Sequence, residues 1–276
     1  MNTFPSVARI LVGATIYLIS LSANSWTING SYDSQQVGDR CKNWSSTGSV
    51  VTDIKSYSGD KSCLQHIDEG KTGFGQWGGI INHPSALKKG DEIWVRIRTF
   101  MPSGFNYDST SGGSRLKFLR VHVRDASSDN LGYNDWYINP KGGGTPFRFI
   151  YEGEQVWSNV GTSDDAIKLG QWETYEYYIK FDNVSVDNGG QARVRFWKNG
   201  ELLNDITDRM TLKNSSAYSD RTHVFTYWNG GSPATQDMYV DDLVITSDTP
   251  GKRDANGNPY IGVGSRIADP NPPSWP

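Results

Sequence analysis

The sequence predicts an all-β protein, built as an antiparallel sandwich of two sheets. Short runs that alternate apolar and polar side chains recur along the chain, and clusters of Gly, Pro, Asn and Ser separate them. The clearest run, residues 116–124, alternates apolar with basic side chains, as a strand packed on one face does. Many such runs between turn clusters indicate a sandwich or barrel. We find no fixed-period repeat, and the only helical signal is a turn near residues 205–212.

Length and charge narrow the class of protein. The chain has 276 residues and a formal net charge of -3. That length suits one large β domain, and the near-neutral charge argues against a general nucleic-acid binder. We therefore expect a monomer with no nucleic-acid partner, and any anion-binding site must be local.

Residues 1–25 read as a secretory signal. Arg9 precedes a short apolar run, and the small residues of Ala-Asn-Ser follow it. A spanning helix needs about 20 apolar residues, so the alternative, an uncleaved membrane anchor, fits less well. We expect a secreted protein with no membrane attachment after cleavage, a single domain over residues 26–249, and a tail over residues 250–276. That Pro- and Gly-rich tail should lie on the domain or fray.

The predicted strands follow one another along the domain. They are residues 48–56, 62–67, 92–100, 116–124, 147–152, 172–181, 192–200, 222–228 and 238–246. Because alternate residues of a strand share a face, several strands should pair an apolar face with one rich in Arg and aromatic rings. These faces carry Trp94, Arg96 and Arg98; Tyr178; Arg195 and Trp197; and Arg120, His122 and Arg124. The alternative is that the arginines only solvate the strands and blunt sheet edges.

The two cysteines, Cys41 and Cys63, predict one disulfide. Export would place the chain in an oxidising compartment, where an isolated even pair is most simply bonded. The alternative is two free buried thiols.

Three stretches resemble the concanavalin-A-like jelly rolls of carbohydrate-active proteins. They are the opening SYDSQQVGDRCKNWSS with YSGDKSCLQH, the middle GQWETYEYYIKF with RVRFWKNGELL, and the closing THVFTYWNGGSPATQDMYVDDLVIT. The resemblance covers about residues 30 to 247 and implies a two-sheet antiparallel jelly roll.

Within that fold, the chain resembles the polysaccharide lyases of the alginate, glucuronan and heparin lyase type. It lacks the Glu-x-Asp-x-x-Glu strand of the laminarinase-type hydrolases, which supplies their two carboxylates. It has WVRIR, then LRVHVR, then VFTYWNGG, in the chain order of the Arg, Gln-Ile-His and Tyr/Asn strands of alginate lyases. The resemblance places His122, Tyr227, Asn229 and either Arg96 or Arg98 in the site. Arg120 stands where the pattern has Gln.

The chemistry of such a lyase assigns expected roles. A base must take the C5 proton of a uronate, an acid must protonate the leaving oxygen, and a cation must offset the carboxylate charge. We expect His122 or Tyr227 as base, Tyr227 as acid and Arg120 as the carboxylate-binding cation. The expected substrate-binding residues are Arg96, Arg98, Arg124, Tyr178, Arg195, Trp197 and Asn229. We expect Arg96 or Arg98 to line one concave sheet with Arg120, His122 and Tyr227. Alternation alone does not say whether Arg96, Arg120 and Arg195 belong to the same sheet.

These roles predict β-elimination of an acidic polysaccharide without a catalytic cofactor. The alternatives are a carbohydrate-binding module or lectin on the same scaffold, and a structural extracellular sandwich. Asp33 and Asp241 could together hold a structural Ca²⁺, because that ion prefers hard oxygen ligands. Two solvated aspartates are the alternative.

Overall fold

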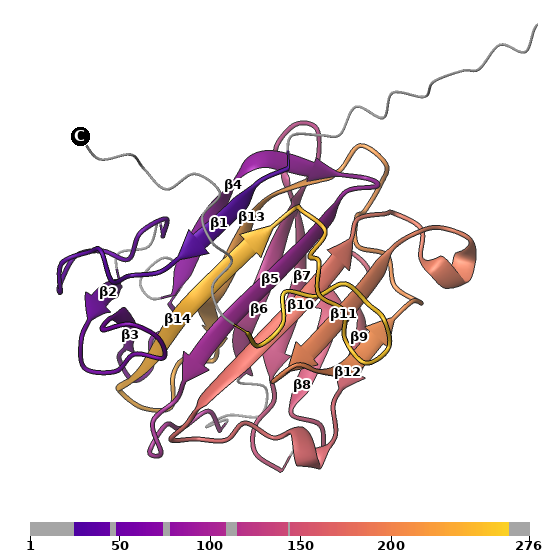
Figure 1. The fold of residues 1–276 in the computed structure, drawn as a ribbon. Coiled ribbons are helices and arrows are strands. Elements are labelled where there is room, and N and C mark those ends of the chain that lie inside the picture. The colour runs from indigo at the N-terminus through magenta and orange to yellow at the C-terminus, as the bar shows by residue number, and fades with distance from the viewer. Residues whose placement is uncertain (1–24, 45–47, 74–77, 109–114, 143, 265–276) are drawn as a thin grey trace, which may run out of the picture.

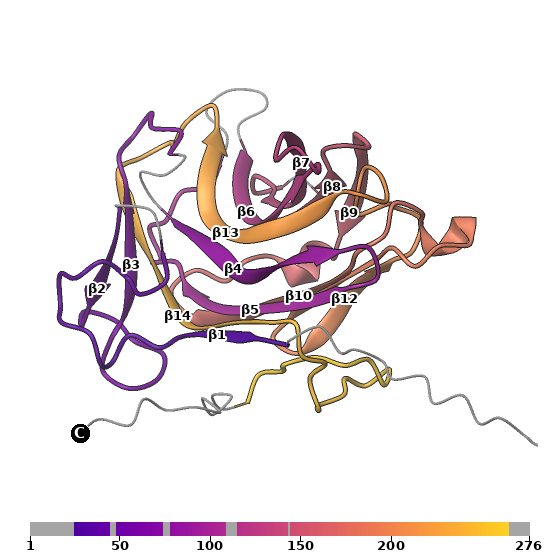
Figure 2. The ribbon, with the colours of Figure 1, turned by 90° about the horizontal axis from the view of Figure 1, so that it is seen from above.

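The computed structural model describes residues 25–44, 48–73, 78–108, 115–142 and 144–264. Two antiparallel sheets pack face to face (Figures 1 and 2), which confirms the predicted jelly-roll sandwich. The predicted signal segment, residues 1–25, lies outside the described residues except for Ser25. Among the described residues, no helix has the length and apolar character needed to cross a membrane.

One sheet has eight strands and the other has six. Across the eight-stranded sheet the order is β12 (Glu201–Ile206), β11 (Arg193–Lys198), β10 (Trp172–Lys180), β5 (Glu92–Phe100), β14 (Gln236–Thr246), β3 (Ser62–Ile67) and β2 (Ser49–Thr52), with β1 (Thr27–Gly30) also paired to β14. Across the six-stranded sheet the order is β4 (Gly79–Lys88), β13 (Tyr218–Asn229), β6 (Arg115–Arg124), β7 (Asn130–Ile138), β8 (Phe147–Tyr151) and β9 (Val156–Val160).

All nine predicted strands are present, and five others were not predicted. The unpredicted strands are β1, β4, β7, β9 and β12. The sequence of β7 contains Asn, Gly and Asp, which usually mark turns, and β4 contains Pro84, which an edge strand tolerates. The predicted helical turn is wrong, because β12 runs to Ile206. The described 3-10 turns are η1 (Ser163–Asp165) and η2 (Val186–Asn188).

Aromatic side chains fill the space between the sheets. Trp136 of β7 stacks on Phe196 of β11 with 4.4 Å between ring centroids. Phe118 of β6 meets Tyr175 of β10 edge to face at 4.9 Å. Both pairs join one sheet to the other, so they fix the distance between the sheets and leave the opposite face of each strand for polar residues.

A β-bulge in β6 changes which residues share a face. Leu119 pairs with Trp136, but Lys117 already pairs with Tyr137, so Phe118 is the extra residue in the ladder. Phe118 and Leu119 are both fully buried in the core. The bulge therefore turns Lys117 to the same face as Arg120, which strict alternation would not do.

The C-terminal segment crosses the outer face of the eight-stranded sheet. Residues 250–264, which we call the strap, lie over β5, β10 and β11 (Figure 1) and on the side away from the six-stranded sheet (Figure 2). Arg96 donates to the carbonyls of Gly262 and Gly264 at 3.0 and 3.1 Å. The carboxylate of Glu176 accepts hydrogen bonds from the backbone N–H groups of Ile261 and Gly262. Of the two arrangements expected for this segment, the described part lies on the domain.

The predicted disulfide is confirmed. Cys41 and Cys63 are bonded, with 5.9 Å between their Cα atoms, and both side chains are buried. The bond ties the loop before β2 to β3, at one edge of the eight-stranded sheet.

Candidate functional site

The outer face of the six-stranded sheet gathers most of the predicted site. In Figure 2 the long strand β13 is curved, and both its ends turn away from the eight-stranded sheet, so this outer side is concave. We call it the concave face. Arg120, His122 and Arg124 of β6 and Tyr227 and Asn229 of β13 lie on it, as predicted. Adjacent residues on the same strands, such as Leu119 and Trp228, point the other way and are buried between the sheets.

Strand register orders these residues along the concave face. Arg115 pairs with Asn229 of β13, Lys117 with Tyr227, and Arg120 with His223. On the other side of β6, Lys117 pairs with Tyr137, Arg120 with Asp135, and His122 with Tyr133.

The other predicted binding residues belong to the opposite side of the molecule. The prediction that Arg96 or Arg98 lines the same sheet as His122 is wrong, because both lie on β5 of the eight-stranded sheet. Tyr178, Arg195 and Trp197 share that sheet's outer face, and Tyr178 and Trp197 pack with Ile261 of the strap. Trp197 donates to Asp254, and Arg98 donates to the carbonyl of Val263. Alternation identified the outer faces of these strands, but it does not say to which sheet a strand belongs.

Four charged groups, three of them buried and Glu152 partly exposed, form a network at the centre of the concave face. The Lys117 ammonium lies 3.0 Å from Asp135 and 2.7 Å from Glu152. Arg120 bonds Asp135 at 2.5 Å, and its guanidinium stacks 3.6 Å from the Tyr133 ring centre. Two cations thus face two carboxylates. We call Lys117, Arg120, Asp135 and Glu152 the charged quartet.

The quartet sets the charge state of its members. Burial raises the pKa of Asp135, but the charges of Arg120 and Lys117 outweigh it and hold that pKa below its ordinary value. Burial lowers the pKa of Lys117, but the charges of Asp135, Tyr137 and Glu152 together outweigh it, and the net shift of that pKa is upward. Burial and the charge of Asp135 raise the pKa of Glu152. Of the two carboxylates, Glu152 is therefore the one that protonates more readily.

Tyr227 stands beside the quartet. The Lys117 nitrogen lies 5.7 Å from the Tyr227 ring centre and 5.2 Å from that of Tyr137. A cation between two phenol rings is favourable for the ring quadrupoles, and it offsets negative charge that develops nearby. Tyr227 is half-buried.

His122 is held by partners on both ring nitrogens. Its Nδ1 lies 3.1 Å from Asp220, and its Nε2 lies 3.1 Å from the Asn130 side-chain oxygen. Burial raises the pKa of Asp220, but hydrogen bonds from His122 and Arg221 and the charge of Arg124 bring it below its ordinary value. His122 is thus a hydrogen-bonded, buried residue between Asp220 and Asn130.

Register also separates His122 from Tyr227. Tyr227 is opposite Lys117, whereas His122 lies beyond Arg120 on the same strand. At about 3.3 Å per residue, Lys117 and His122 are about 13 Å apart along β6 when the bulged residue is left out. His122 and Tyr227 share the concave face, as predicted, but they do not lie opposite one another on β6 and β13.

Several residues of the concave face were not predicted. They are Lys117, Asp135, Glu152, Tyr133, Tyr137, Arg115, Arg148 and Trp157. Three features made these residues hard to predict from the sequence: the bulge at Phe118, the turn-like composition of β7, and the shortness of β9. His223, whose phase matches that of Tyr227, lies on this face opposite Arg120, where burial and the Arg120 charge lower its pKa.

Asp33 and Asp241 use their carboxylates on backbone groups. Asp33 accepts the N–H groups of Asp60 and Lys61, and Asp241 accepts those of Tyr57 and Ser58. A calcium ion would have to share these oxygens with the loop at residues 57–61. Within the described ranges, no group of three or more His, Cys, Asp or Glu is placed to hold a metal ion. The calcium site stays a prediction.

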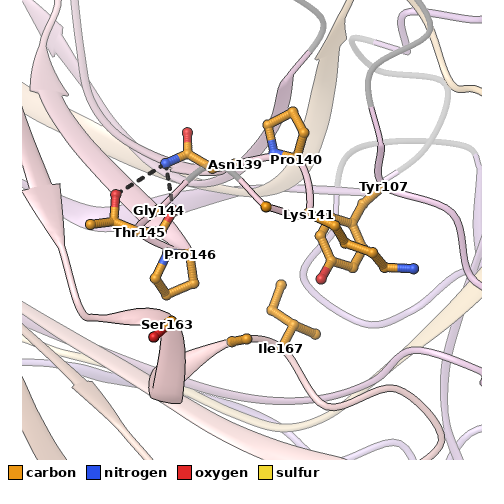
Figure 3. Close-up of a pocket in the computed structure, with 11 residues that line it drawn as sticks. Tyr107, Asn139, Pro140, Lys141, Gly144, Thr145, Pro146, Ser163 and Ile167 are labelled. Carbon is orange, nitrogen blue, oxygen red and sulfur yellow. Dashed lines mark hydrogen bonds between the residues drawn. The ribbon is translucent and has the colours of Figure 1, made fainter.

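A separate pocket of about 230 Å³ lies where β7 ends and β8 begins. Figure 3 shows Tyr107, Lys141 and Ile167 around it, with Asn139 bonded to Thr145 on its rim. Lys141 is its one charged lining residue, and its nitrogen lies over the Tyr107 ring at 5.3 Å. The described lining of this pocket contains no carboxylate, in contrast to the concave face with Asp135 and Glu152.

Polysaccharide lyases are among the solved structures with this architecture. The alginate lyase Aly36B aligns with a TM-score of 0.56 at 16% identity, over 79% of this chain and 96% of that protein. A form of it with a lysine and a tyrosine changed to alanine has been solved with an alginate tetrasaccharide. The alginate lyase of Aplysia kurodai gives 0.55 at 9% identity, over 81% and 98%. The glucuronan lyase of the fungus Trichoderma reesei gives 0.51 at 12% identity, over 78% and 96%.

These likenesses show that the chain has the jelly-roll fold of those lyases. The chain matches no protein-family model and no curated protein sequence.

Proposed function

We propose that this protein is a secreted polysaccharide lyase that cleaves a uronate-containing polymer by β-elimination on its concave face. The observation that carries the proposal is the Lys117 ammonium next to Tyr227, inside a face rich in cations and aromatic rings. The fold shared with alginate and glucuronan lyases supports the substrate class. The disulfide supports export to an oxidising compartment.

Each step of the elimination has a candidate group. The Tyr227 oxygen takes the C5 proton as a phenolate, and the C–H electrons form the C4–C5 double bond. The glycosidic oxygen leaves C4 and receives that proton back from the phenol. The Lys117 ammonium offsets the charge that builds on the uronate carboxylate during this transfer. The proton taken from C5 is the one returned to the leaving oxygen, so atoms and charge balance, and the proposal includes no catalytic cofactor.

The other predicted catalytic residues take supporting roles in this proposal. Arg120 is paired with Asp135 and stacked on Tyr133, so it positions the quartet that holds Lys117. His122 is hydrogen-bonded at both ring nitrogens, so it holds the side chains of Asp220 and Asn130 in place at one end of the concave face. Arg124 and Asn229 lie further along the same face and would contact neighbouring sugars.

A non-catalytic carbohydrate-binding protein is the second candidate. It is favoured by the pairing of Lys117 and Arg120 with the protein's own carboxylates, which lowers the net charge offered to a substrate. Such a protein would bind acidic polymers on the same face and leave them intact.

The deciding experiment exposes the purified protein, residues 26–276, to alginate, glucuronan and heparin. β-Elimination creates an unsaturated uronate with a new ultraviolet absorbance, so a lyase gives a rising signal on at least one polymer. Binding to a polymer without any such signal would favour the second candidate.

A further inference from the structure

Three side chains form a compact cluster beside the proposed catalytic residues. Arg115 begins β6, Arg148 lies on β8 and Trp157 lies on β9. The Arg148 guanidinium carbon is 4.7 Å from the Trp157 ring centre, and that of Arg115 is 5.7 Å from the same centre. The Tyr137 ring meets Trp157 edge to face at 5.1 Å. One indole therefore brings two guanidinium groups together.

The two arginines differ from the other cations of this face, because among the described residues neither has a carboxylate partner. Lys117, Arg120, Arg124 and Arg221 each pair with a carboxylate. Within the described ranges, neither Arg115 nor Arg148 has a carboxylate within ion-pair distance. The buried Nε of Arg148 has no hydrogen-bond partner among the described residues.

Two like charges held together cost free energy unless an anion joins them. Burial and the charge of Arg115 both lower the pKa of Arg148, which records that cost. Guanidinium groups bind carboxylates through paired N–H donors, and two of them can share one.

Register places this cluster next to the reacting position. Arg115 lies two residues before Lys117 on β6, and Arg148 is opposite Tyr137, itself opposite Lys117. A chain of sugars that crosses Tyr227 and Lys117 would thus set its next unit against the cluster.

We propose that Arg115 and Arg148, held over Trp157, form a subsite for the carboxylate of the sugar next to the one that is cleaved. This inference rests on the proposed function, and it defines the substrate more narrowly. The polymer should carry uronates on consecutive sugars, because a neutral neighbour would leave two guanidinium groups unpaired under bound substrate.

The test measures binding without turnover. Tetrasaccharides of alginate and glucuronan, and the same chains with carboxyl groups reduced to alcohols, are titrated calorimetrically into the Tyr227→Phe protein. Arg115→Gln with Arg148→Gln is then added to that background. The matched control is Arg193→Gln, which removes one charge from the eight-stranded sheet, where Arg193 pairs with Asp205.

We expect the double change to weaken binding of at least one acidic tetrasaccharide by tenfold or more and to reduce its salt dependence. Binding of the reduced chains should not change, and Arg193→Gln should have less than a twofold effect. Unchanged affinity in the double variant, or an equal loss on the reduced chains, would overturn the subsite. Failure of the lyase proposal looks different: the wild-type protein would bind the acidic chains with this same arginine dependence but generate no unsaturated product. If the acidic chains do not bind at all, the subsite is wrong.

Discussion

At the scale of single residues, the Tyr227 hydroxyl is the group on which the proposed chemistry depends most. Replacing Tyr227 with Phe keeps the ring beside Lys117 and removes only the proton carrier. We expect elimination to slow by about 10²-fold or more, the usual scale of lost acid–base catalysis, with affinity for the polymer retained. Initial rates of unsaturated-uronate formation and calorimetric binding measure the two effects separately.

The control for that change is Tyr218→Phe. Tyr218 lies on the same strand, at the far end near Arg124, and its hydroxyl bonds Ser128. An equal loss of rate in both variants would mean that Tyr227 has no special role.

Glu152 limits the positive charge that the quartet offers. Its carboxylate lies 2.7 Å from the Lys117 nitrogen, and its side chain is 25% exposed. Glu152→Gln keeps the shape and removes the charge, so an acidic polymer should bind about fivefold tighter, equivalent to about 1 kcal/mol. Burial raises the pKa of Glu152, so the wild-type protein should also bind more tightly as the pH falls through that raised pKa.

Binding titrations across acidic and neutral pH check this prediction. Glu154→Gln, on the following turn, is the matched control, and it should leave both the affinity and its pH dependence unchanged. If Glu152→Gln binds as the wild type does at every pH, Glu152 does not compete with the substrate.

At the scale of elements, the strap depends on the carboxyl group of Glu176. Burial raises its pKa to about 7, although the N–H groups of Ile261 and Gly262 and the charge of Arg96 act in the other direction. The folded protein therefore holds this proton more tightly than the unfolded chain, whose ordinary value is 4.5. The contribution of Glu176 to the free energy of unfolding is therefore fully present below pH 4.5, and it is lost as the pH rises through about 7.

Glu176→Gln should remove that part of the pH dependence. Calorimetric melting temperatures from pH 4.5 to 7 measure it, and the difference between the two proteins isolates Glu176 from other groups such as Asp241, whose pKa burial raises to about 6. Glu201→Gln, at the exposed start of β12, is the control. Parallel curves for the wild type and Glu176→Gln would contradict this account of the strap.

At the scale of the whole molecule, the disulfide restricts the unfolded chain. Cys41 and Cys63 are 22 residues apart, and closing a loop of that length is worth about 3 kcal/mol in the chain-entropy model. The double variant Cys41→Ala, Cys63→Ala should lose about that free energy of unfolding in denaturant titrations. A reductant should lower the free energy of unfolding of the wild-type protein and leave that of the variant unchanged. Equal stability of the two proteins would show that the bond contributes nothing.

The sequence by itself determined the sandwich, the disulfide and the faces of individual strands. Alternation in residues 92–100 and 116–124 was enough to separate core from surface, because the side-chain period of a strand is fixed. It correctly put Arg120, His122 and Arg124 on one face and Trp94, Arg96 and Arg98 on another. The resemblance to jelly-roll lyases added Tyr227 and Asn229 to the face of His122.

Tertiary structure alone decided which faces meet. Strands β5 and β6 belong to different sheets, and the strap bonds to Arg96 and Arg98. These two arginines therefore lie outside the predicted site. The bulge at Phe118 brought Lys117 beside Tyr227, although alternation assigned Lys117 to the core. Sheet pairing and bulges depend on contacts between residues far apart in the chain, and a local period carries no information about them.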